Sequence, residues 1–468
     1  MTIEQLYEIY LRHPSIRTDT RQLKQGDLFF ALKGPNFNGN AFATRAFELG
    51  AAYAIIDETP DASQLSPHLA DHLIVVPDVL STLQELALHH RRQFNIPFIA
   101  ITGSNGKTTT KELIHATLSS TYTTYTTRGN LNNHIGIPLT ILSVQKDAQF
   151  AVIEMGANHQ KEIEAYCRYT LPTHGIITNV GKAHLEGFGG PEGVKKGKGE
   201  LYDFLRSTQV PAIGGASAAG TAFVLKDSAD LTQMSRGIPH LITYGTRDAD
   251  VTGEIVPSEA LLKVDITGGA ATGPIQTQLV GDYNLPNVLV AVAVGCHFGV
   301  PDTAIRQAIE QYAPSNSRSQ LIERDGLHII LDAYNANPSS MRAAIENFAR
   351  LPIPGAQTPA NPRTELSLPG STVPSNGLSP SRKVLILGAM AELGPESLAE
   401  HQGIIDLIGQ YSWQQVVLVG GDFRHLSHPY LSFANSKEAG RWLAGVGLKD
   451  SYLLIKGSRS MKMEEVLG

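Results

Sequence analysis

The chain has 468 residues, more than one hydrophobic core usually holds, and about three domains of roughly 150 residues are expected. Hydrophobic residues make up 42% and charged residues 18%, a balance that excludes a disordered or fibrous chain. The formal net charge of −6 argues against a nucleic-acid partner and fits small anionic substrates, which local lysines such as Lys195, Lys196 and Lys198 would attract.

The sequence also indicates the compartment. Cys167 and Cys296 stand far apart without metal-ligand spacing, so we interpret them as buried apolar thiols. Glu4 and Glu8 interrupt the N-terminal apolar residues, unlike a signal peptide. The longest apolar stretch, Val288 to Cys296, is far shorter than the ~20 residues that span a bilayer. We therefore expect a cytoplasmic protein without membrane insertion, and a monomer by default.

Residues 1–95 combine short apolar runs with an amphipathic stretch from Val79 to Arg91. The apolar runs are Asp27 to Leu32, Ala51 to Ile56 and His72 to Val76. This pattern predicts a small α/β domain that ends near Asn95-Ile96-Pro97.

The next segment, residues 96–313, alternates buried-strand and helical patterns. Phe98 to Ile101 predicts a strand that runs into a Gly-rich turn and then a helix. Further strands are predicted at Phe150 to Ile153, Gly175 to Thr178 and Ala212 to Gly214. This rhythm is typical of a mostly parallel sheet, so we predict a central nucleotide-binding domain here.

The pattern breaks at Gln311 to Ser315, and residues 314–468 predict a third α/β domain. Its predicted strands are Gly326 to Leu331, Lys383 to Leu387, Gln415 to Val419 and Tyr452 to Ile455. Residues 352–382 are rich in Pro, Ser, Thr and Gly, and we interpret them as a surface insertion without chemistry.

The sharpest motif is the run Thr102 to Thr110, which follows a strand and opens a helix. Backbone N–H groups of such a loop converge on phosphate oxygens, a lysine adds charge and a threonine can ligate Mg²⁺. Ile101 occupies the position where a standard phosphate loop has its first glycine, so the motif is the shorter Gly-x-x-Gly-Lys-Thr. The predicted nucleotide contacts are Gly103, Ser104, Asn105, Gly106, Lys107, Thr108 and Thr109.

Two polar residues follow neighbouring predicted strands. Glu154 ends the strand that should lie beside the one feeding the loop, where a carboxylate can hold Mg²⁺. His184 lies just past the polar turn that follows the predicted strand Gly175 to Thr178. Either residue alone would be read as structural. Together with the phosphate loop they predict metal ligands.

These motifs, with the run Ala183-His184-Leu185-Glu186 to Lys198-Gly199-Glu200, resemble the Mur ligases of peptidoglycan synthesis. The resemblance implies a three-domain α/β architecture with a central phosphate-loop domain of mostly parallel sheet and a Rossmann-like C-terminal domain. It also implies that Lys198 is carbamylated and supports a second Mg²⁺, in a metal set of Thr108, Glu154, His184 and Lys198.

Within the family, the third domain indicates the branch. Asp332-Ala333-Tyr334-Asn335-Ala336-Asn337-Pro338 resembles the signature of the enzymes that add D-alanyl-D-alanine. Leu387 to Gly394 with His401, and Lys456 to Arg459, match the same branch. The resemblance implies UDP-N-acetylmuramoyl-tripeptide and D-alanyl-D-alanine as substrates, with the third tripeptide residue left open. The implied substrate contacts are Thr20, Arg21, Asn130, Asn133, Tyr334, Asn335 and Asn337.

The family mechanism joins the substrates through an acyl phosphate made from ATP. Tyr283, Asn284 and Asn287 match adenine contacts, and Arg318 and Asp332 match residues that reach the ATP phosphates and ribose. The implied catalytic residues are Lys107, Lys198, His184 and Arg318, with two Mg²⁺ ions. No general base for the amine is indicated. We expect closure of the third domain to assemble the site.

Three alternative classes of protein fit the sequence less well. A folate-polyglutamate-type ligase usually has Gly-Lys-Gly where this chain has Gly106-Lys107-Thr108. The diaminopimelate- or lysine-adding Mur ligases carry Asp-Asn-Pro-Arg, whereas Ala360-Asn361-Pro362-Arg363 lacks the aspartate. A nucleotide-binding regulatory protein without ligase chemistry would have no reason to keep His184, Lys198 and the third-domain motif together.

Overall fold

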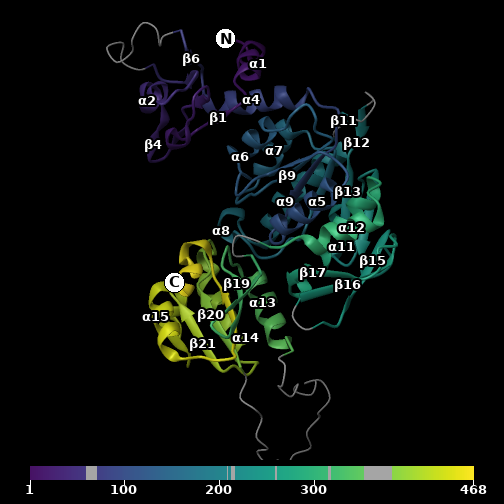
Figure 1. Ribbon diagram of the computed structural model, residues 1–468, viewed down its shortest axis with the longest axis vertical. Helices are drawn as coiled ribbons and strands as arrows, with labels where there is room; N and C mark the ends of the chain where they lie inside the picture. The colour runs from purple at the N-terminus through teal and green to yellow at the C-terminus, as the bar shows by residue number, and fades with distance from the viewer. Residues whose placement is uncertain (60–70, 208, 212–216, 259–260, 315–317, 353–381) are drawn as a thin grey trace, which may run out of the picture. The chain divides into compact units, whose positions relative to one another are not determined.

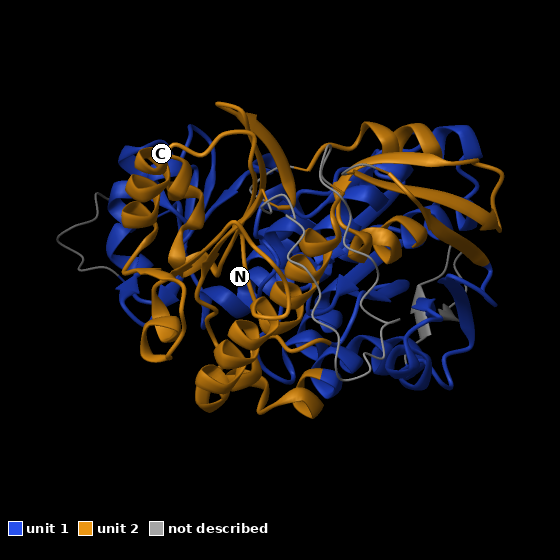
Figure 2. Cartoon of the chain, turned by 90° about the horizontal axis from the view of Figure 1, so that it is seen from below, with its two compact units in different colours: residues 1–180, 195–250, 290–305 blue, residues 181–194, 251–289, 306–468 orange. Residues whose placement is uncertain are grey.

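The computed structural model describes residues 1–59, 71–207, 209–211, 217–258, 261–314, 318–352 and 382–468 (Figure 1). The chain forms two compact units (Figure 2). The first comprises residues 1–180, 195–250 and 290–305, and the second residues 181–194, 251–289 and 306–468. The boundaries expected near residues 95 and 313 stay predictions. No helix among the described residues combines the length and apolar character that a bilayer span requires.

The N-terminal part of the first unit is built on a four-stranded parallel sheet, in the order β1-β2-β5-β6. These strands are β1 (Ile16–Arg17), β2 (Leu28–Phe30), β5 (Tyr53–Ile56) and β6 (Leu73–Val75), with a separate hairpin of β3 (Lys33–Gly34) and β4 (Phe37–Asn38). The helices are α1 (Ile3–Arg12), α2 (Ala43–Glu48) and α4 (Val79–Arg91). Phe29, Ala54 and Ile56 lie in its core. The small α/β fold predicted for this region is confirmed.

Helix α4 connects this part to the rest of the first unit. It begins where the Asp78 carboxylate accepts a hydrogen bond from the Ser81 N–H, a typical helix cap. At its other end the buried Arg91 guanidinium donates to the carbonyls of Thr170, the last residue of α7 (Glu162–Thr170), and of Leu171, which caps that helix. The guanidinium also lies 3.9 Å from the Phe98 ring centroid. A cation placed at carbonyls that lack helical partners stabilises both helix ends.

The central sheet of the first unit has six parallel strands in the order β14-β13-β10-β7-β9-β8. They are β7 (Phe98–Thr102), β8 (Thr124–Thr126), β9 (Phe150–Glu154), β10 (His174–Ile177), β13 (Thr221–Leu225) and β14 (His240–Gly245). Strands β7 and β9 are buried throughout, as expected where helices cover both faces of a parallel sheet. The parallel sheet predicted from the sequence is confirmed, except that residues 212–214 lie outside the described chain.

The helices of this part include α5, which follows the phosphate-loop motif as predicted and packs against β7, β8 and β9. They are α5 (Lys107–Ser119), α6 (Gly136–Leu142), α7 (Glu162–Thr170), α9 (Pro191–Ser207) and α10 (Ala229–Met234), and the short pair β11 (Gln209–Pro211) and β12 (Ser217–Ala219) lies beyond α9 in the chain.

The second unit contains an antiparallel meander that the sequence did not predict. It consists of β15 (Val251–Val256), β16 (Leu261–Gly268) and β17 (Ile275–Val280). The unit also holds the short helix α8 (Leu185–Phe188) and most of α12 (Asp302–Gln311), and α11 (Leu285–His297) begins in it and ends in the first unit.

The C-terminal sheet of the second unit has the order β18-β19-β23-β20-β21-β22, parallel except for the β18–β19 pair. Its strands are β18 (Gln320–Arg324), β19 (Leu327–Asp332), β20 (Lys383–Gly388), β21 (Gln415–Val419), β22 (Leu431–Phe433) and β23 (Tyr452–Lys456), and its helices are α13 (Pro338–Arg350), α14 (Ser397–Ile408) and α15 (Ser436–Val446). Ile329, Ile386 and Ile455 lie in its core. The four strands predicted here are confirmed. Residues 353–381 of the predicted insertion lie outside the described chain.

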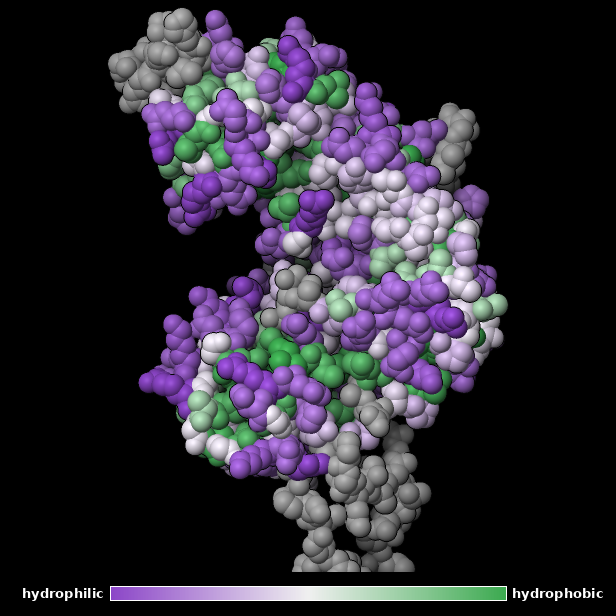
Figure 3. Space-filling view, in the orientation of Figure 1, coloured by the Kyte–Doolittle hydropathy of each residue, from purple (hydrophilic) through white to green (hydrophobic). Residues whose placement is uncertain are grey.

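The surface is mixed. Hydrophilic residues and smaller apolar patches alternate on the face drawn in Figure 3, which is ordinary for a folded protein.

Candidate active site

The loop between β7 and α5 depends on two glycines with positive φ. Gly103 has φ +141°, and a Cβ there would lie 2.0 Å from Thr178 Oγ1. Gly106 has φ +79° and precedes the first residue of α5. Ile101, where a standard phosphate loop has a glycine, is a buried strand residue. The shorter motif is therefore sufficient to turn the backbone onto the helix N-terminus.

The end of β10 fixes this loop. Ser104 N–H donates to the Asn179 carbonyl and Asn105 N–H to Asn179 Oδ1, both at 3.0 Å. Thr178 Oγ1 donates to the Asn105 carbonyl at 2.6 Å. Lys107 Nζ, 2.7 Å from the Gly103 carbonyl, lies back over the loop. A lysine in that place adds a full positive charge to the partial charge of the α5 N-terminus.

Glu154 lies directly beside the loop, as predicted. Ile101 and Glu154 are partners across the β7–β9 pair. Thr108 Oγ1 donates to Glu154 Oε2 at 2.9 Å, and Asn132 Nδ2 donates to Glu154 Oε1 at 2.8 Å. The Glu154 side chain is buried with the residue 2% exposed. A threonine hydroxyl and a carboxylate this close supply the hard oxygen ligands that Mg²⁺ prefers.

Lys198 is buried in α9, with the residue only 1% exposed. Its Nζ donates to the Ala157 carbonyl at 3.0 Å, three residues beyond Glu154. Burial lowers the pKa of Lys198 well below its usual value, and the positive charge of Lys107 lowers it further. The ordinary interpretation of this lysine as a solvated surface residue is therefore wrong.

His184 belongs to the second unit, in a left-handed conformation with φ +52° just before α8. Its Nδ1 forms a short contact with a carboxylate oxygen of Glu392, in the loop after β20. Lys182 Nζ lies 2.5 Å from Glu400 in the same unit. These contacts attach the turn that carries His184 to the C-terminal part of the chain.

The expected metal ligands therefore divide between the units. Thr108, Glu154 and Lys198 belong to the first unit, and His184 to the second. In the described ranges, three or more His, Cys, Asp or Glu side chains do not gather in a metal-binding group. The four-residue metal set stays a prediction, and its best-formed part is the Thr108–Glu154 pair.

The predicted adenine contacts lie in the second unit. Gly281 has φ +99°, and a Cβ there would meet the Tyr283 ring at 2.3 Å. Tyr283 Oη lies 3.1 Å from Ser319 Oγ. Asn284 Nδ2 donates to the Val280 carbonyl, and Asn287 Nδ2 to Asn284 Oδ1. The two amides hold each other and the end of β17, so their contact with a base stays a prediction.

Arg318 and Asp332 are brought together around the end of β19. The Arg318 guanidinium carbon lies 3.5 Å from the Tyr334 ring centroid. Asp332 Oδ1 accepts the Ser319 N–H at 3.2 Å, and its Oδ2 lies 2.5 Å from Lys456 Nζ. This constellation lies within the second unit.

The remaining predicted substrate contacts are dispersed. Asn337 caps α13 by accepting the Ser340 N–H, whereas Asn335 is exposed. Asn133 Oδ1 accepts from the backbone at the start of α6, and Asn130 is exposed. Arg21, with an exposed side chain, pairs with Asp19 at 2.6 Å next to Thr20, and its hydrogen bonds lower the pKa of Asp19 to about 2. The contribution of these residues to substrate binding stays a prediction.

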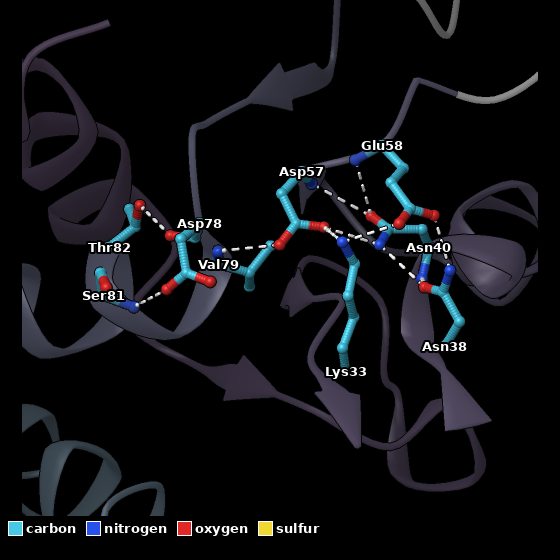
Figure 4. Close-up of polar contacts among 9 residues, drawn as sticks. All are labelled: Lys33, Asn38, Asn40, Asp57, Glu58, Asp78, Val79, Ser81 and Thr82. Carbon is cyan, nitrogen blue, oxygen red and sulfur yellow. Dashed lines mark hydrogen bonds and ion pairs between the residues drawn. The ribbon is translucent and has the colours of Figure 1, made fainter. Parts of the chain in front are cut away.

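A polar cluster anchors the β3–β4 hairpin (Figure 4). Lys33 Nζ lies 2.9 Å from Asp57 and 2.7 Å from Glu58. Asn40 donates to Asp57, and Asn38 donates to Glu58. These bonds fasten the hairpin to the residues that follow β5.

Sequence reasoning missed three partners of the predicted residues. Asn132 holds Glu154, Glu392 holds His184 and Lys456 holds Asp332. Glu392 and Lys456 lie inside motifs that the sequence singled out, and Asn132 lies between the predicted contacts Asn130 and Asn133. Pairs of residues separated by 22 to 208 positions leave no local sequence signal. Only the strand order of the sheets shows which of these distant residues come into contact.

The fold and this loop define an α/β protein with a phosphate-binding loop at the carboxyl end of a parallel sheet. The family model for the Mur ligase middle domain matches residues 101–295. The family model for the Mur ligase catalytic domain matches residues 14–91. The chain is 32% identical to the UDP-N-acetylmuramoyl-tripeptide--D-alanyl-D-alanine ligase of Bacillus subtilis, over 98% of this chain and 93% of that protein. It therefore belongs to the Mur ligase family.

Two further relatives support this family membership. The ligase of the same name from Escherichia coli is 31% identical, over 97% of this chain and 92% of that protein. The crystal structure of MurF from Acinetobacter baumannii superimposes with a TM-score of 0.80 at 28% identity, covering 100% of this chain and 97% of that one. The α/β fold class expected from the sequence, with a central phosphate-loop domain and a Rossmann-like C-terminal domain, is thereby confirmed.

Proposed function

We propose that this chain is an ATP-dependent amide ligase that joins D-alanyl-D-alanine to UDP-N-acetylmuramoyl-tripeptide, giving the pentapeptide precursor of peptidoglycan. The observation that carries the proposal is the phosphate loop with Glu154 against Thr108, in a chain similar over its whole length to ligases of that name. We infer a cytoplasmic monomer.

The loop is suited to the phosphates of ATP. Backbone N–H groups of residues 103–109 and Lys107 would bind them, and Arg318 would reach the γ-phosphate. Thr108 and Glu154 would hold one Mg²⁺, whose charge offsets the repulsion between ATP and a substrate carboxylate. Tyr283, Asn284 and Asn287 would bind the adenine, and Asp332 the ribose.

Lys198 has the environment that a carbamate requires. An amine reacts with CO₂ only when it is neutral, and burial favours the neutral form of this lysine. Carbamylation would join the neutral Nζ to CO₂ and release a proton, leaving a buried carboxylate near the Ala157 carbonyl that with His184 would support a second Mg²⁺. That ion would add positive charge near the transferred phosphoryl group.

The proposed reaction has two steps, formation of an acyl phosphate and then of the amide. A carboxylate oxygen of the tripeptide attacks the γ-phosphorus of ATP, and ADP leaves, while Lys107 and Arg318 stabilise the charge on the phosphoryl oxygens. The amine of D-alanyl-D-alanine then attacks the acyl carbon, forming the amide and releasing inorganic phosphate. Thr20, Arg21, Asn130 and Asn133 would orient the UDP-tripeptide, and Asn335 and Asn337 the dipeptide.

The test is phosphate release from ATP and Mg²⁺ by the purified protein. Both substrates are supplied together and then each is omitted, and the product is identified by mass. We expect rapid release and pentapeptide formation only with both substrates. If another carboxylate and amine support turnover while this pair does not, the ligase core stands and the assigned substrates are wrong.

A further inference from the structure

Tyr334 holds Arg318 by its aromatic face. The guanidinium carbon lies 3.5 Å from the ring centroid, well within the range of a cation–π contact. Stacking occupies the face of the guanidinium and leaves its N–H donors, which point outward in the plane, available for an anion. Among the described residues, no hydrogen bond or ion pair engages the Arg318 side chain in competition with such an anion.

The neighbouring backbone is held at a second point. Ser319 is a non-glycine residue with φ +47°, a strained backbone conformation that persists only where surrounding contacts fix it. Its N–H donates to Asp332 Oδ1 at 3.2 Å, and its hydroxyl lies 3.1 Å from Tyr283 Oη. Arg318 is therefore held at two points by the end of β19 and the residues after it. Asp332 binds the neighbouring Ser319 N–H, and the Tyr334 ring packs on the guanidinium.

We propose that Tyr334 is a positioning residue that presents the Arg318 guanidinium to the γ-phosphate through the face of its ring. This inference rests on the proposed role of Arg318 in the ligase reaction. It gives Tyr334 a task that needs the aromatic ring and not the hydroxyl. A direct contact between Tyr334 and the dipeptide would instead use the hydroxyl or the ring edge.

The matched variants are Tyr334→Phe, which keeps the ring face, and Tyr334→Leu, which keeps apolar bulk without it. We expect Tyr334→Phe to retain kcat within about twofold and Tyr334→Leu to lower it about tenfold, the scale of a lost cation–π contact. The KM for D-alanyl-D-alanine should be the same in the two variants. The hydroxyl is absent from both, so their difference isolates the ring.

A second readout does not depend on turnover. The ring current of Tyr334 should shift the Arg318 Nε–Hε resonance of the full-length protein, identified by its loss in Arg318→Lys. The shift should persist in Tyr334→Phe and disappear in Tyr334→Leu.

The proposal is supported if Tyr334→Leu loses the resonance shift and has a lowered kcat while Tyr334→Phe keeps both. An unshifted wild-type resonance, equal kcat in the two variants, or a raised dipeptide KM in Tyr334→Leu relative to Tyr334→Phe overturns it. Failure of the wild-type protein to make the pentapeptide overturns the proposed function instead, and the resonance then still reports whether Tyr334 holds Arg318.

Discussion

Lys456 Nζ lies 2.5 Å from Asp332 Oδ2, and the Lys456 side chain is only 3% exposed. The pair joins adjacent ends of β19 and β23, since Asp332 and Lys456 are partners in the parallel register. Lys456 also donates to the Asn335 carbonyl at 3.2 Å. The buried Lys456 ammonium thus fixes Asp332, the predicted ribose contact, and also Asn335, a predicted dipeptide contact.

Removing only the cation should destabilise the second unit. Lys456→Met leaves the Asp332 carboxylate without its partner, which typically costs about 3 kcal/mol. The double variant Lys456→Met, Asp332→Asn removes the stranded charge and should recover part of that loss. Urea unfolding of the three proteins measures the difference. A double variant less stable than Lys456→Met would contradict the argument.

The Thr108–Glu154 pair predicts a Mg²⁺-dependent defect. Glu154→Gln keeps a hydrogen-bond acceptor for Thr108 but removes the charge that would hold the ion, so kcat/KM should fall about 100-fold and the required Mg²⁺ concentration should rise. Thr108→Val should behave similarly, while Thr108→Ser, which keeps the hydroxyl, serves as the control. Phosphate release titrated with Mg²⁺ is the measurement. An unchanged Mg²⁺ requirement in Glu154→Gln would exclude Glu154 as a ligand.

Lys198 should be replaceable by an added carboxylate. We expect Lys198→Ala to lower phosphate release about 100-fold, because the carbamate is lost, and small carboxylates such as propionate to restore part of it by entering the vacated space. Lys196→Ala removes an exposed lysine of the same helix and should change nothing. Rescue of Lys198→Ala by amines, or its absence with every carboxylate, would contradict a carbamate.

The sequence predicted most strands because their apolar runs are continuous, as in Phe98 to Ile101 and Phe150 to Ile153. It also placed Glu154 beside the loop, since strand ends of a parallel sheet meet at one edge. It did not predict the β15–β17 meander, because the strands were predicted from continuous apolar runs and these strands have none. In β16 and β17, buried residues alternate with more exposed ones, the pattern of half-buried strands. Nor did it indicate that Lys198 is buried, because burial depends on how α9 packs and not on the local residues.

The His184–Glu392 pair predicts that Glu392 orients His184 as a metal ligand. A carboxylate that accepts the Nδ1–H of an imidazole fixes its tautomer and leaves Nε2 for a metal, and losing such a partner typically weakens metal affinity about tenfold or more. Glu392→Gln should therefore weaken Mn²⁺ binding, followed by electron paramagnetic resonance, by about tenfold. Glu396→Gln, at an exposed site four residues further along the same connection to α14, is the matched control. Equal affinities in the two variants would argue against His184 as a ligand held by Glu392.

His90 predicts how the stability of the first unit depends on pH. Its Nε2 lies 2.9 Å from the Val144 carbonyl and its Nδ1 3.0 Å from Tyr7 Oη, so the neutral ring donates to the carbonyl and accepts from the hydroxyl. Burial lowers the pKa of His90, with a smaller contribution from His89. The unfolded chain therefore binds this proton more readily than the folded one, near an ordinary histidine pKa of about 6.5.

The stabilisation from His90 is complete above that value and is lost as the pH falls through the lower folded pKa. Protonation also removes the acceptor for Tyr7, a hydrogen bond worth about 1 kcal/mol. We expect the Tm of the wild type to drop by a few degrees more than that of His90→Gln between pH 8 and pH 5. His240→Gln, which replaces an exposed histidine of the same unit, should follow the wild type. A His90→Gln protein that loses as much stability as the wild type over this range would show that the proton binds elsewhere.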